Sequence, residues 1–161
     1  MKVPEESKQL YAALGRVPSG LFVLTIARSD VETGMLASWV QQCSFEPPLL
    51  SVAIQRGRDI SALLTAGAVF TLNILDDSQT DMIAHFGKGP AKGEPIFNGL
   101  EVLRGEGSGP VLNEALGFVN CVVTGKFPAG DHDLVIAQVI AGRLLNDGQP
   151  MVHVRKSASH Y

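Results

Sequence analysis

The stretch GMLASWVQQCSFEPPLLS, residues 34–51, decides the fold of this chain. Its first part, residues 35–40, has the apolar, aromatic and β-branched content of a strand, with the small residues Ala37 and Ser38 at the centre. A flat group could come close to the backbone of such a strand. The pair Pro47-Pro48 then removes two backbone donors and favours extended geometry, so we expect a turn before a buried strand resumes at 49–54. The pattern fits either an ordinary hairpin or the rim of a ligand site.

The composition describes a single globular domain over residues 1–161. A hydrophobic content of 45% and 17 glycines are typical of a well-packed, turn-rich chain that can bury one sizeable core. The net charge of -3, without a run of Lys or Arg, gives no electrostatic footprint for nucleic acid or a membrane surface. The sequence shows neither a signal peptide nor a membrane-spanning run, so the expected location is the cytoplasm.

The two cysteines, Cys43 and Cys121, lack C-x-x-C spacing and lie in apolar, strand-like surroundings. We therefore expect two buried free thiols, although the sequence leaves a disulfide between them open.

A first short helix is predicted over residues 4–16. Leu10, Ala13 and Leu14 fall on one of its faces, and Pro4 and the acids suit its first turn. We expect the apolar face to pack on the body of the protein.

Two further helices are predicted, over residues 60–66 and 76–86, because each has a capping residue near its start and a glycine after its end. The expected caps and terminators are Asp59 and Gly67 for the first helix and Ser78 and Gly87 for the second.

The rest of the chain has the pattern of short strands separated by glycine, proline and aspartate turns. The predicted strands cover residues 21–27, 68–75, 100–103, 116–126, 133–145 and 151–155. Such spacing indicates a closed or nearly closed antiparallel barrel, so the fold class is mainly β with a few short flanking helices.

The loop Gln55-Arg56-Gly57-Arg58-Asp59 precedes the second predicted helix. Backbone N–H groups at a helix start lack intrahelical partners, so this loop and its two arginines could bind a phosphate. They could equally be two solvated surface arginines.

Three other polar positions have two interpretations each. Asn73 lies in a buried strand, where it either holds neighbouring backbone or contacts a ligand. His85 is near a helix end and has either a packing or a ligand role. His132 follows the Gly130-Asp131 turn at a strand mouth, where it either faces a ligand or is solvated.

The segment GKGPAKGEPIFN, residues 87–98, is the longest irregular stretch and a candidate lid or dimer loop. It lacks the spacing of a P-loop, and no G-x-G-x-x-G opens a helix after a strand. The four histidines form no H-E-x-x-H pattern, and G-x-S-x-G is absent, so a metal enzyme or a serine hydrolase is not indicated. Any nucleotide would be held by something other than a Rossmann unit.

The chain resembles the flavin reductase-like, FMN-binding split-barrel family. GMLASWVQQCSFEPP is similar to its G-M-T-A-S-W … S-x-x-P-P signature, GRDISALLTAGAVFTLNIL to its helix and following strand, and GDHDLVIAQV to its Gly-Asp-His strand entrance. With the HVRKSASHY ending, the chain looks most like the flavin reductase module at the C-terminal end of flavodiiron proteins of photosynthetic microbes. The likeness covers nearly the whole chain, whereas the iron-binding residues of those proteins have no counterpart.

The resemblance implies a site for FMN, with FAD as the second choice, and for NADH or NADPH as co-substrate. The isoalloxazine is expected along residues 36–39, the phosphate near the arginine loop, and His132 on the nicotinamide side. No catalytic side chain is required. The cofactor-binding residues implied are Leu36, Ala37, Ser38, Trp39, Cys43, Ser44, Gln55, Arg56, Arg58, Asn73, His85, Phe86 and His132.

The sequence departs from the family pattern at two of these places. Leu36 stands where many relatives have Thr, and QRGRD replaces the commoner Lys/Ser/Arg/Thr loop. A hydroxyl contact to the flavin is thereby lost.

The function implied is that of an NAD(P)H:flavin oxidoreductase that passes reducing equivalents from a nicotinamide to flavin and on to an acceptor. The alternative is a non-catalytic flavin- or haem-binding carrier on the same barrel, and a third candidate is a ligand-free dimeric interaction module. The resemblance also implies a homodimer and allows a redox partner protein.

Overall fold

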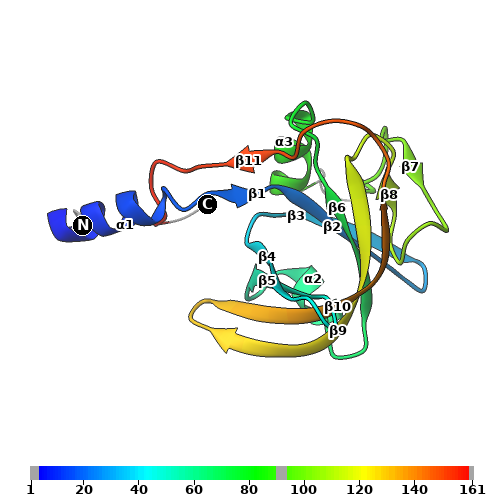
Figure 1. Cartoon of the computed structure of the whole chain (residues 1–161), viewed down its shortest axis with the longest axis horizontal. Helices are drawn as coiled ribbons and strands as arrows, with labels where there is room; N and C mark the ends of the chain where they lie inside the picture. The colour runs from blue at the N-terminus through cyan, green and yellow to red at the C-terminus, as the bar shows by residue number, and fades with distance from the viewer. Residues whose placement is uncertain (1–3, 90–93, 160–161) are drawn as a thin grey trace.

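The structure is a computed structural model that describes residues 4–89 and 94–159. These described residues form fourteen helices and strands, whose arrangement is drawn in Figure 1. They are α1 (Glu5–Leu14), β1 (Ser19–Gly20), β2 (Phe22–Arg28), β3 (Val31–Ala37), β4 (Val40–Ser44), β5 (Leu49–Gln55), α2 (Asp59–Leu63), β6 (Val69–Ile74), α3 (Asp81–Lys88), β7 (Val102–Leu103), β8 (Val111–Leu112), β9 (Gly117–Ala129), β10 (His132–Leu144) and β11 (Val152–His153).

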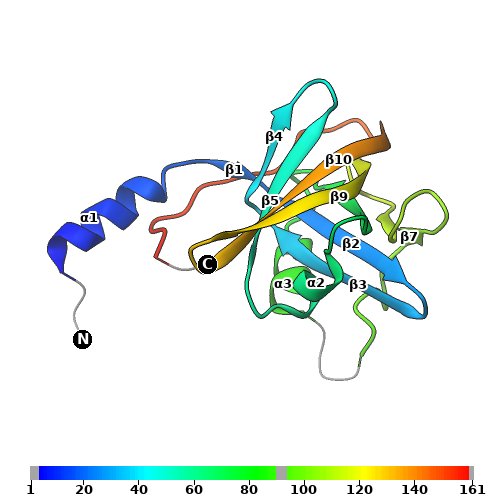
Figure 2. The same ribbon diagram turned by 90° about the horizontal axis from the view of Figure 1, so that it is seen from below.

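Seven antiparallel strands form the main sheet, in the order β3-β2-β6-β9-β10-β5-β4. The sheet curls so that β2, β3 and β6 form one wall and β4, β5 and the ends of β9 and β10 the other (Figures 1 and 2). The edge strands β3 and β4 are consecutive in the chain but do not pair with each other. The barrel is therefore split between them, as expected for the split-barrel fold that the resemblance implied.

The predicted strand over residues 35–40 is interrupted at this split. β3 ends at Ala37, Ser38 and Trp39 lie between the strands, and β4 begins at Val40. The backbone N–H of Ala53 on β5 donates to the carbonyl of Trp39 at 3.0 Å, which fixes the crossing from one wall to the other. The small residues of this stretch thus lie at a corner of the barrel rather than within one strand.

Two apolar clusters make up the core. The first fills the barrel and includes Leu24, Ile54, Phe70, Val123 and Val135, all nearly or fully buried. The second lies outside the sheet, between β2, α3 and the segment from Ile96 to Ala115, and contains Val23, Leu75, Phe86 and Phe97. Strand β2 contributes to both clusters because its side chains alternate between the two faces of the sheet.

The β9–β10 hairpin forms the long arm of the sheet, and its turn is Gly130-Asp131, as its register pairs Ala129 with His132. Gly130 has φ of 64°, a backbone conformation that glycine adopts at little cost in a two-residue turn. His132 is therefore the first residue of β10, and it pairs with Gln55 at the end of β5.

A buried polar network ties the loop before β8 to the sheet. The amide of Asn73 donates to the carbonyl of Val23 at 3.1 Å and accepts from the backbone N–H of Leu112 at 2.8 Å. Thr71 donates to Asn120 at 2.7 Å, and Thr25 donates to the carbonyl of Pro110 at 2.7 Å. Of the two interpretations of Asn73, the geometry supports the one in which it holds neighbouring backbone.

The prediction for helix α1 is right in its range and wrong in its packing. None of its residues is buried, and Leu10 and Leu14 are 54% and 48% exposed. The helix projects away from the barrel (Figures 1 and 2). The apolar face exists, but within this chain nothing among the described residues covers it.

The ends of the other two helices differ from their predictions. Helix α2 stops at Leu63 rather than near Gly67, and Asp59 is its first residue rather than its cap. Helix α3 begins at Asp81, after a turn in which Ser78 binds the carboxylate of Asp76, and it runs through Gly87 to Lys88. Both starts lack a side-chain cap, so the capping signals here mark turns.

The predicted strands of the last third are confirmed, although those at 100–103 and 151–155 shorten to β7 and β11. Part of the predicted lid or dimer loop, residues 90–93, lies outside the described residues. Both thiols are free, but Cys43 is exposed, so the expectation of two buried thiols is wrong for Cys43. It lies where the β4–β5 register shifts between Gln42 and Ser44, which disturbs the alternation of the strand.

Within residues 4–89 and 94–159, no helix has the length and apolarity needed to cross a bilayer. The same residues contain no group of three His, Cys, Asp or Glu side chains placed to hold a metal ion.

Candidate functional site

A pocket of about 100 Å³ lies where β3 ends against β5, and we call it the β3–β5 pocket. It brings together five of the residues that the resemblance implied: Leu36, Ala37, Ser38, Gln55 and Arg58. The other lining residues are Met35, Ala53 and Gly87. Half of the lining residues are therefore small, and Arg58 is the cation among them.

A second pocket of about 280 Å³ adjoins the first under the end of α3, and we call it the α3 pocket. The two pockets share Met35, Arg58 and Gly87. Phe86, also implied by the resemblance, lines the α3 pocket together with Lys88. Residues from β3, β5, the loop before α2 and the end of α3 thus form one continuous site.

Two cations, Arg58 and Lys88, and two acids, Glu32 and Glu94, line the α3 pocket. Both carboxylate oxygens of Glu32 bind Arg104, at 2.8 and 2.9 Å. This hydrogen bonding holds the pKa of Glu32 below its usual range, so the carboxylate stays ionised and paired. Arg58 and Lys88 consequently contribute more of the local field than Glu32 does.

The two arginines of the predicted phosphate loop have different surroundings. Arg56 Nε donates to Asp133 Oδ1 at 3.0 Å, and the Arg56 backbone N–H donates to the carbonyl of Asp131. Arg56 therefore braces the β9–β10 hairpin, while Arg58 lines both pockets. Helix α2 is only five residues long, so the prediction of an anion site depends on Arg58 and not on the helix dipole.

An aromatic cluster adjoins the β3–β5 pocket through Gln55. His132 pairs with Gln55 across β10 and β5, is 7% exposed, and lies with its ring centroid 4.8 Å from that of Trp39. Its Nδ1 lies 2.6 Å from Asp131 Oδ1, and this hydrogen bond lowers the pKa of Asp131. His132 is thus held in place rather than solvated, which favours the functional interpretation.

Arg155 belongs to the same cluster, although no sequence pattern singled it out as a site residue. Its guanidinium carbon lies 5.2 Å from the centroid of the Trp39 ring, a cation–π geometry. The pairing of β1 with β11, together with the backbone hydrogen bonds of Met151 to Leu21 and Leu75, brings this part of the chain back to the barrel.

Four implied residues lie elsewhere. Asn73 is fully buried in the polar network of the sheet. Cys43 and Ser44 lie on β4, and neither lines the β3–β5 or the α3 pocket. His85 Nε2 lies 2.6 Å from the carbonyl of Ile96, and its ring meets the edge of Phe86, so it holds the wall of the α3 pocket from behind.

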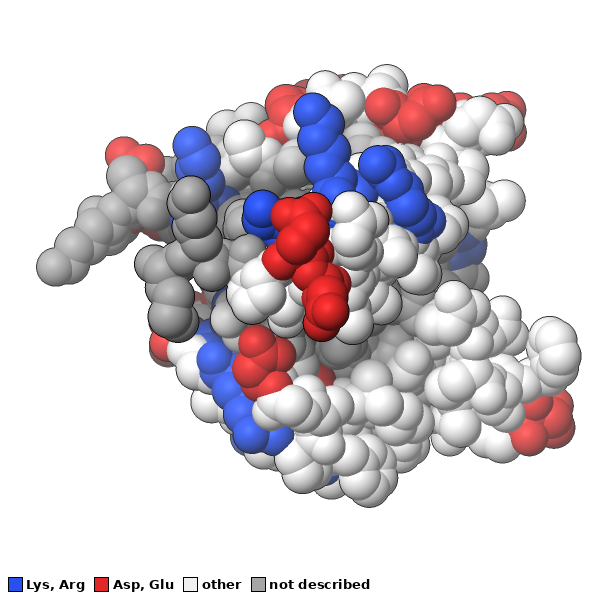
Figure 3. Space-filling view, turned by 90° about the vertical axis from the view of Figure 1, so that its left-hand side faces the viewer, with Lys and Arg blue, Asp and Glu red and all other residues white. Residues whose placement is uncertain are grey.

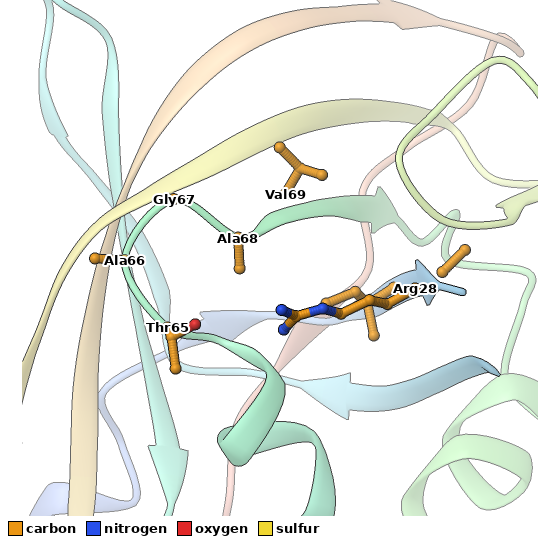
Figure 4. Close-up of a pocket in the computed structure, with 8 residues that line it drawn as sticks. Arg28, Thr65, Ala66, Gly67, Ala68 and Val69 are labelled. Carbon is orange, nitrogen blue, oxygen red and sulfur yellow. The ribbon is translucent and has the colours of Figure 1, made fainter. Parts of the chain in front are cut away.

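A separate pocket of about 360 Å³ lies at the far end of β2, between Arg28 and the loop 65–69 (Figure 4). The Arg28 side chain extends toward Thr65 in this view. It shares no lining residue with the β3–β5 or the α3 pocket. It is therefore a useful place for control substitutions.

The split barrel and the continuous site at its corner define the class of flavin reductase folds. The chain belongs to the flavin reductase-like family, because the flavin reductase like domain matches residues 14–160. The fold and family predicted from the sequence are confirmed, and membership of the family supports the assignment as an oxidoreductase of the flavoprotein class.

Relatives and solved structures agree with this membership. The chain is similar to the diflavin flavoprotein A 1 of Synechocystis sp., with 36% identity over 154 residues, 94% of this chain and 27% of the relative. It spans about a quarter of the length of such relatives. Its fold is similar to the NADH:FAD oxidoreductase SgcE6 of Streptomyces globisporus (TM-score 0.81, 23% identity, 96% of this chain and 92% of that chain). It is also similar to the styrene monooxygenase flavin reductase of Pseudomonas putida (TM-score 0.73, 26% identity, 89% and 90%).

Proposed function

We propose that this protein is an NAD(P)H:flavin oxidoreductase that binds FMN, with FAD as the second choice. The observation that carries the proposal is the continuous site in which small side chains and Arg58 lie next to the Trp39–His132 pair. Small residues at Ala37, Ser38 and Gly87 leave space for a flat ring, and Arg58 provides a cation for a phosphate. The residues present therefore fit a flavin mononucleotide.

The bound flavin and the nicotinamide supply the hydride chemistry, and the polypeptide supplies binding and orientation. The residues at 36–38 offer backbone groups and small side chains on one side of the ring, and Arg58 holds the phosphate end. His132 and Trp39 would line the side that receives the nicotinamide. The rigid fixing of His132 by Asp131 restricts the pose of that nicotinamide.

The visible absorption spectrum of the purified protein with added FMN tests this proposal directly. Bleaching of the bound flavin bands under anaerobic conditions after addition of NADH or NADPH is the expected result, and it identifies the preferred donor. Bound flavin that stays oxidised with both donors would instead support the carrier. If no flavin is retained, steady-state turnover separates a reductase that releases its flavin from a barrel that has lost its ligand.

Two apolar features support a homodimer: a groove on the sheet and the exposed apolar face of α1. A groove of about 500 Å³ is lined by residues of β2, β4, β5, β6, β9 and β10, among them Phe22, Val40, Leu49 and Val139. On the face from which α1 projects, charged side chains gather in the upper and left parts, and a broad area at lower right has few (Figure 3). We propose that the apolar face of α1 from a second copy of the chain covers this groove of about 500 Å³.

The mass in solution tests the homodimer. Light scattering should give twice the chain mass of 17.1 kDa, and Leu10→Lys, which puts a charge on the exposed face of α1, should shift the protein toward the single-chain mass. A wild-type protein with the mass of one chain would contradict this proposal. A redox partner protein as the acceptor and the cytoplasmic location stay predictions from the sequence.

A further inference from the structure

We propose that Arg155 binds the diphosphate of the nicotinamide nucleotide, and this inference rests on the proposed reductase function. The site described so far provides Arg58 for the flavin phosphate, but it assigns no cation to the second nucleotide. A dinucleotide such as NADH carries two phosphate charges of its own. Arg155, whose guanidinium lies over the Trp39 ring, is a cation next to the pair that would receive the nicotinamide.

The first observation is that Arg155 is half-buried and has no acidic partner in the part of the chain that the structure describes. Arg56, Arg104 and Arg143 each pair with a carboxylate at 2.8–3.1 Å. Among residues 4–89 and 94–159, no carboxylate lies within ion-pair distance of Arg155. The Arg155 side chain contacts the Trp39 ring. Keeping a guanidinium partly desolvated without a counter-charge has a cost, which an anionic ligand would offset.

The second observation is that the backbone holds Arg155 in position before any ligand arrives. β11 pairs with β1 just before it, and the Arg155 N–H donates to the carbonyl of Gly15 at 3.0 Å. A Cβ on Gly15 would lie 2.6 Å from the carbonyl oxygen of Arg155, so only glycine permits this approach. Such pre-organisation lowers the entropy cost of binding.

The third observation is the order of groups between the β3–β5 pocket and Arg155. Gln55 lines the pocket and pairs with His132; His132 contacts Trp39; and Trp39 contacts Arg155. A nicotinamide over the His132–Trp39 pair would therefore have its diphosphate on the Arg155 side. The two acids nearby, Asp131 and Asp133, are already engaged by His132 and Arg56, so they compete little for Arg155.

The test compares Arg155→Gln and Arg155→Lys with the matched control Arg143→Gln, which removes an exposed arginine that pairs with Glu106. The KM for NADH or NADPH should rise roughly tenfold in Arg155→Gln, less in Arg155→Lys and little in the control. The value of kcat and the Kd for FMN should stay within about twofold, since the arginine contacts neither reacting ring. Added salt should weaken the wild-type enzyme more than Arg155→Gln.

A binding measurement without turnover gives a second readout. Trp39 is the single tryptophan of the chain, so its fluorescence reports directly on the cluster. Titration with ADP-ribose, which has the diphosphate but no nicotinamide, should change this fluorescence in the wild type, with roughly tenfold weaker binding in Arg155→Gln.

The outcomes separate the two proposals. Equal KM and equal ADP-ribose affinity in Arg155→Gln and the control, with a wild type that oxidises NADH or NADPH, would overturn the role of Arg155 and leave the reductase intact. A wild type that binds ADP-ribose through Arg155 but never reduces flavin would overturn the reductase alone. Circular dichroism and the Arg155→Lys variant distinguish loss of binding from loss of folding.

Discussion

The imidazole of His132 lies 4.8 Å from the indole of Trp39, with the two rings tilted by 40°. The two residues are far apart in the sequence and meet at β5: the carbonyl of Trp39, between β3 and β4, accepts from Ala53, and His132, which starts β10, pairs with Gln55. Asp131 holds the imidazole at Nδ1, so its orientation is set by the hairpin turn. This pair is where the reductase proposal can be tested most sharply.

Replacement of His132 should separate nicotinamide oxidation from flavin binding. We expect His132→Ala to lower kcat/KM for NADH or NADPH by about tenfold to a hundredfold, because the nicotinamide loses a positioning surface. The bound flavin spectrum should persist. The control is His153→Ala on β11, which should leave kcat/KM unchanged. Equal activity of His132→Ala and wild type would favour a carrier.

Replacement of Arg58 should weaken the binding of phosphorylated flavin. We expect Arg58→Gln to raise the Kd for FMN by about tenfold, because a charge-assisted hydrogen bond to phosphate is lost. Riboflavin, which has no phosphate, should bind both proteins alike. Arg28→Gln, in the separate pocket of Figure 4, is the matched control. An equal loss for riboflavin would show that Arg58 does not read the phosphate.

Gly87→Ala should have opposite effects on stability and on flavin binding. The added methyl would meet Leu36 Cδ2 at an ordinary 3.7 Å, so the folded chain tolerates it, and alanine favours a helix over glycine by about 0.5–1 kcal/mol. Because Gly87 borders both pockets, the same methyl should weaken FMN binding several-fold. Thermal unfolding and flavin titration measure the two effects. Ala84→Gly, on the exposed face of α3, should lower stability and leave binding unchanged.

Asn73 should be needed for stability and dispensable for flavin contact. Asn73→Ala leaves the N–H of Leu112 without its acceptor and the carbonyl of Val23 without its donor. We expect the free energy of unfolding in urea to fall by about 2–3 kcal/mol. Asn113→Ala, which removes an exposed contact to Glu101, should cost less than about 0.5 kcal/mol. A shifted flavin spectrum in Asn73→Ala at full stability would restore the ligand role.

The two cysteines should differ in reactivity toward a thiolate-selective reagent. Burial raises the pKa of the Cys121 thiol to about 12, so at pH 8 it stays neutral and shielded. Cys43 is exposed. We expect one thiol to react in the native protein and both, of the two in the chain, in denaturant. Two fast thiols in the native state would contradict the burial of Cys121.

Much of the site could be predicted from the sequence because it lies on contiguous residues. The small residues at 36–38 and Arg58 follow from a strand and a loop that are local in the chain, and the Gly130-Asp131 turn fixes where His132 starts its strand. The prediction that this site binds FMN came from the family resemblance. What the pattern could not give is the break after Ala37, since strand content alone does not show where a barrel splits.

The remaining differences have physical causes that local patterns do not contain. An apolar helical face shows that something should cover Leu10 and Leu14, but not whether the cover belongs to the same chain. A register shift at Cys43 reverses the expected side of a strand without a glycine or proline to mark it. Arg155 is more than a hundred residues from Trp39, and long-range pairing, such as that of β1 with β11, brings them together.

The same pairing has a consequence for engineering the protein. Ser19 and Gly20 pair with His153 and Val152, and the backbone N–H of Ala158 donates to the carbonyl of Tyr11. The first helix and the last described residues therefore form one stalk on one side of the barrel (Figure 1). A tag or fusion partner attached to either end would be next to this stalk, and a displacement of the stalk would also displace Arg155. Insertions are better placed in the β2–β3 turn, because the loop between β6 and α3 is hydrogen-bonded to residues 149–151, which lead into the stalk.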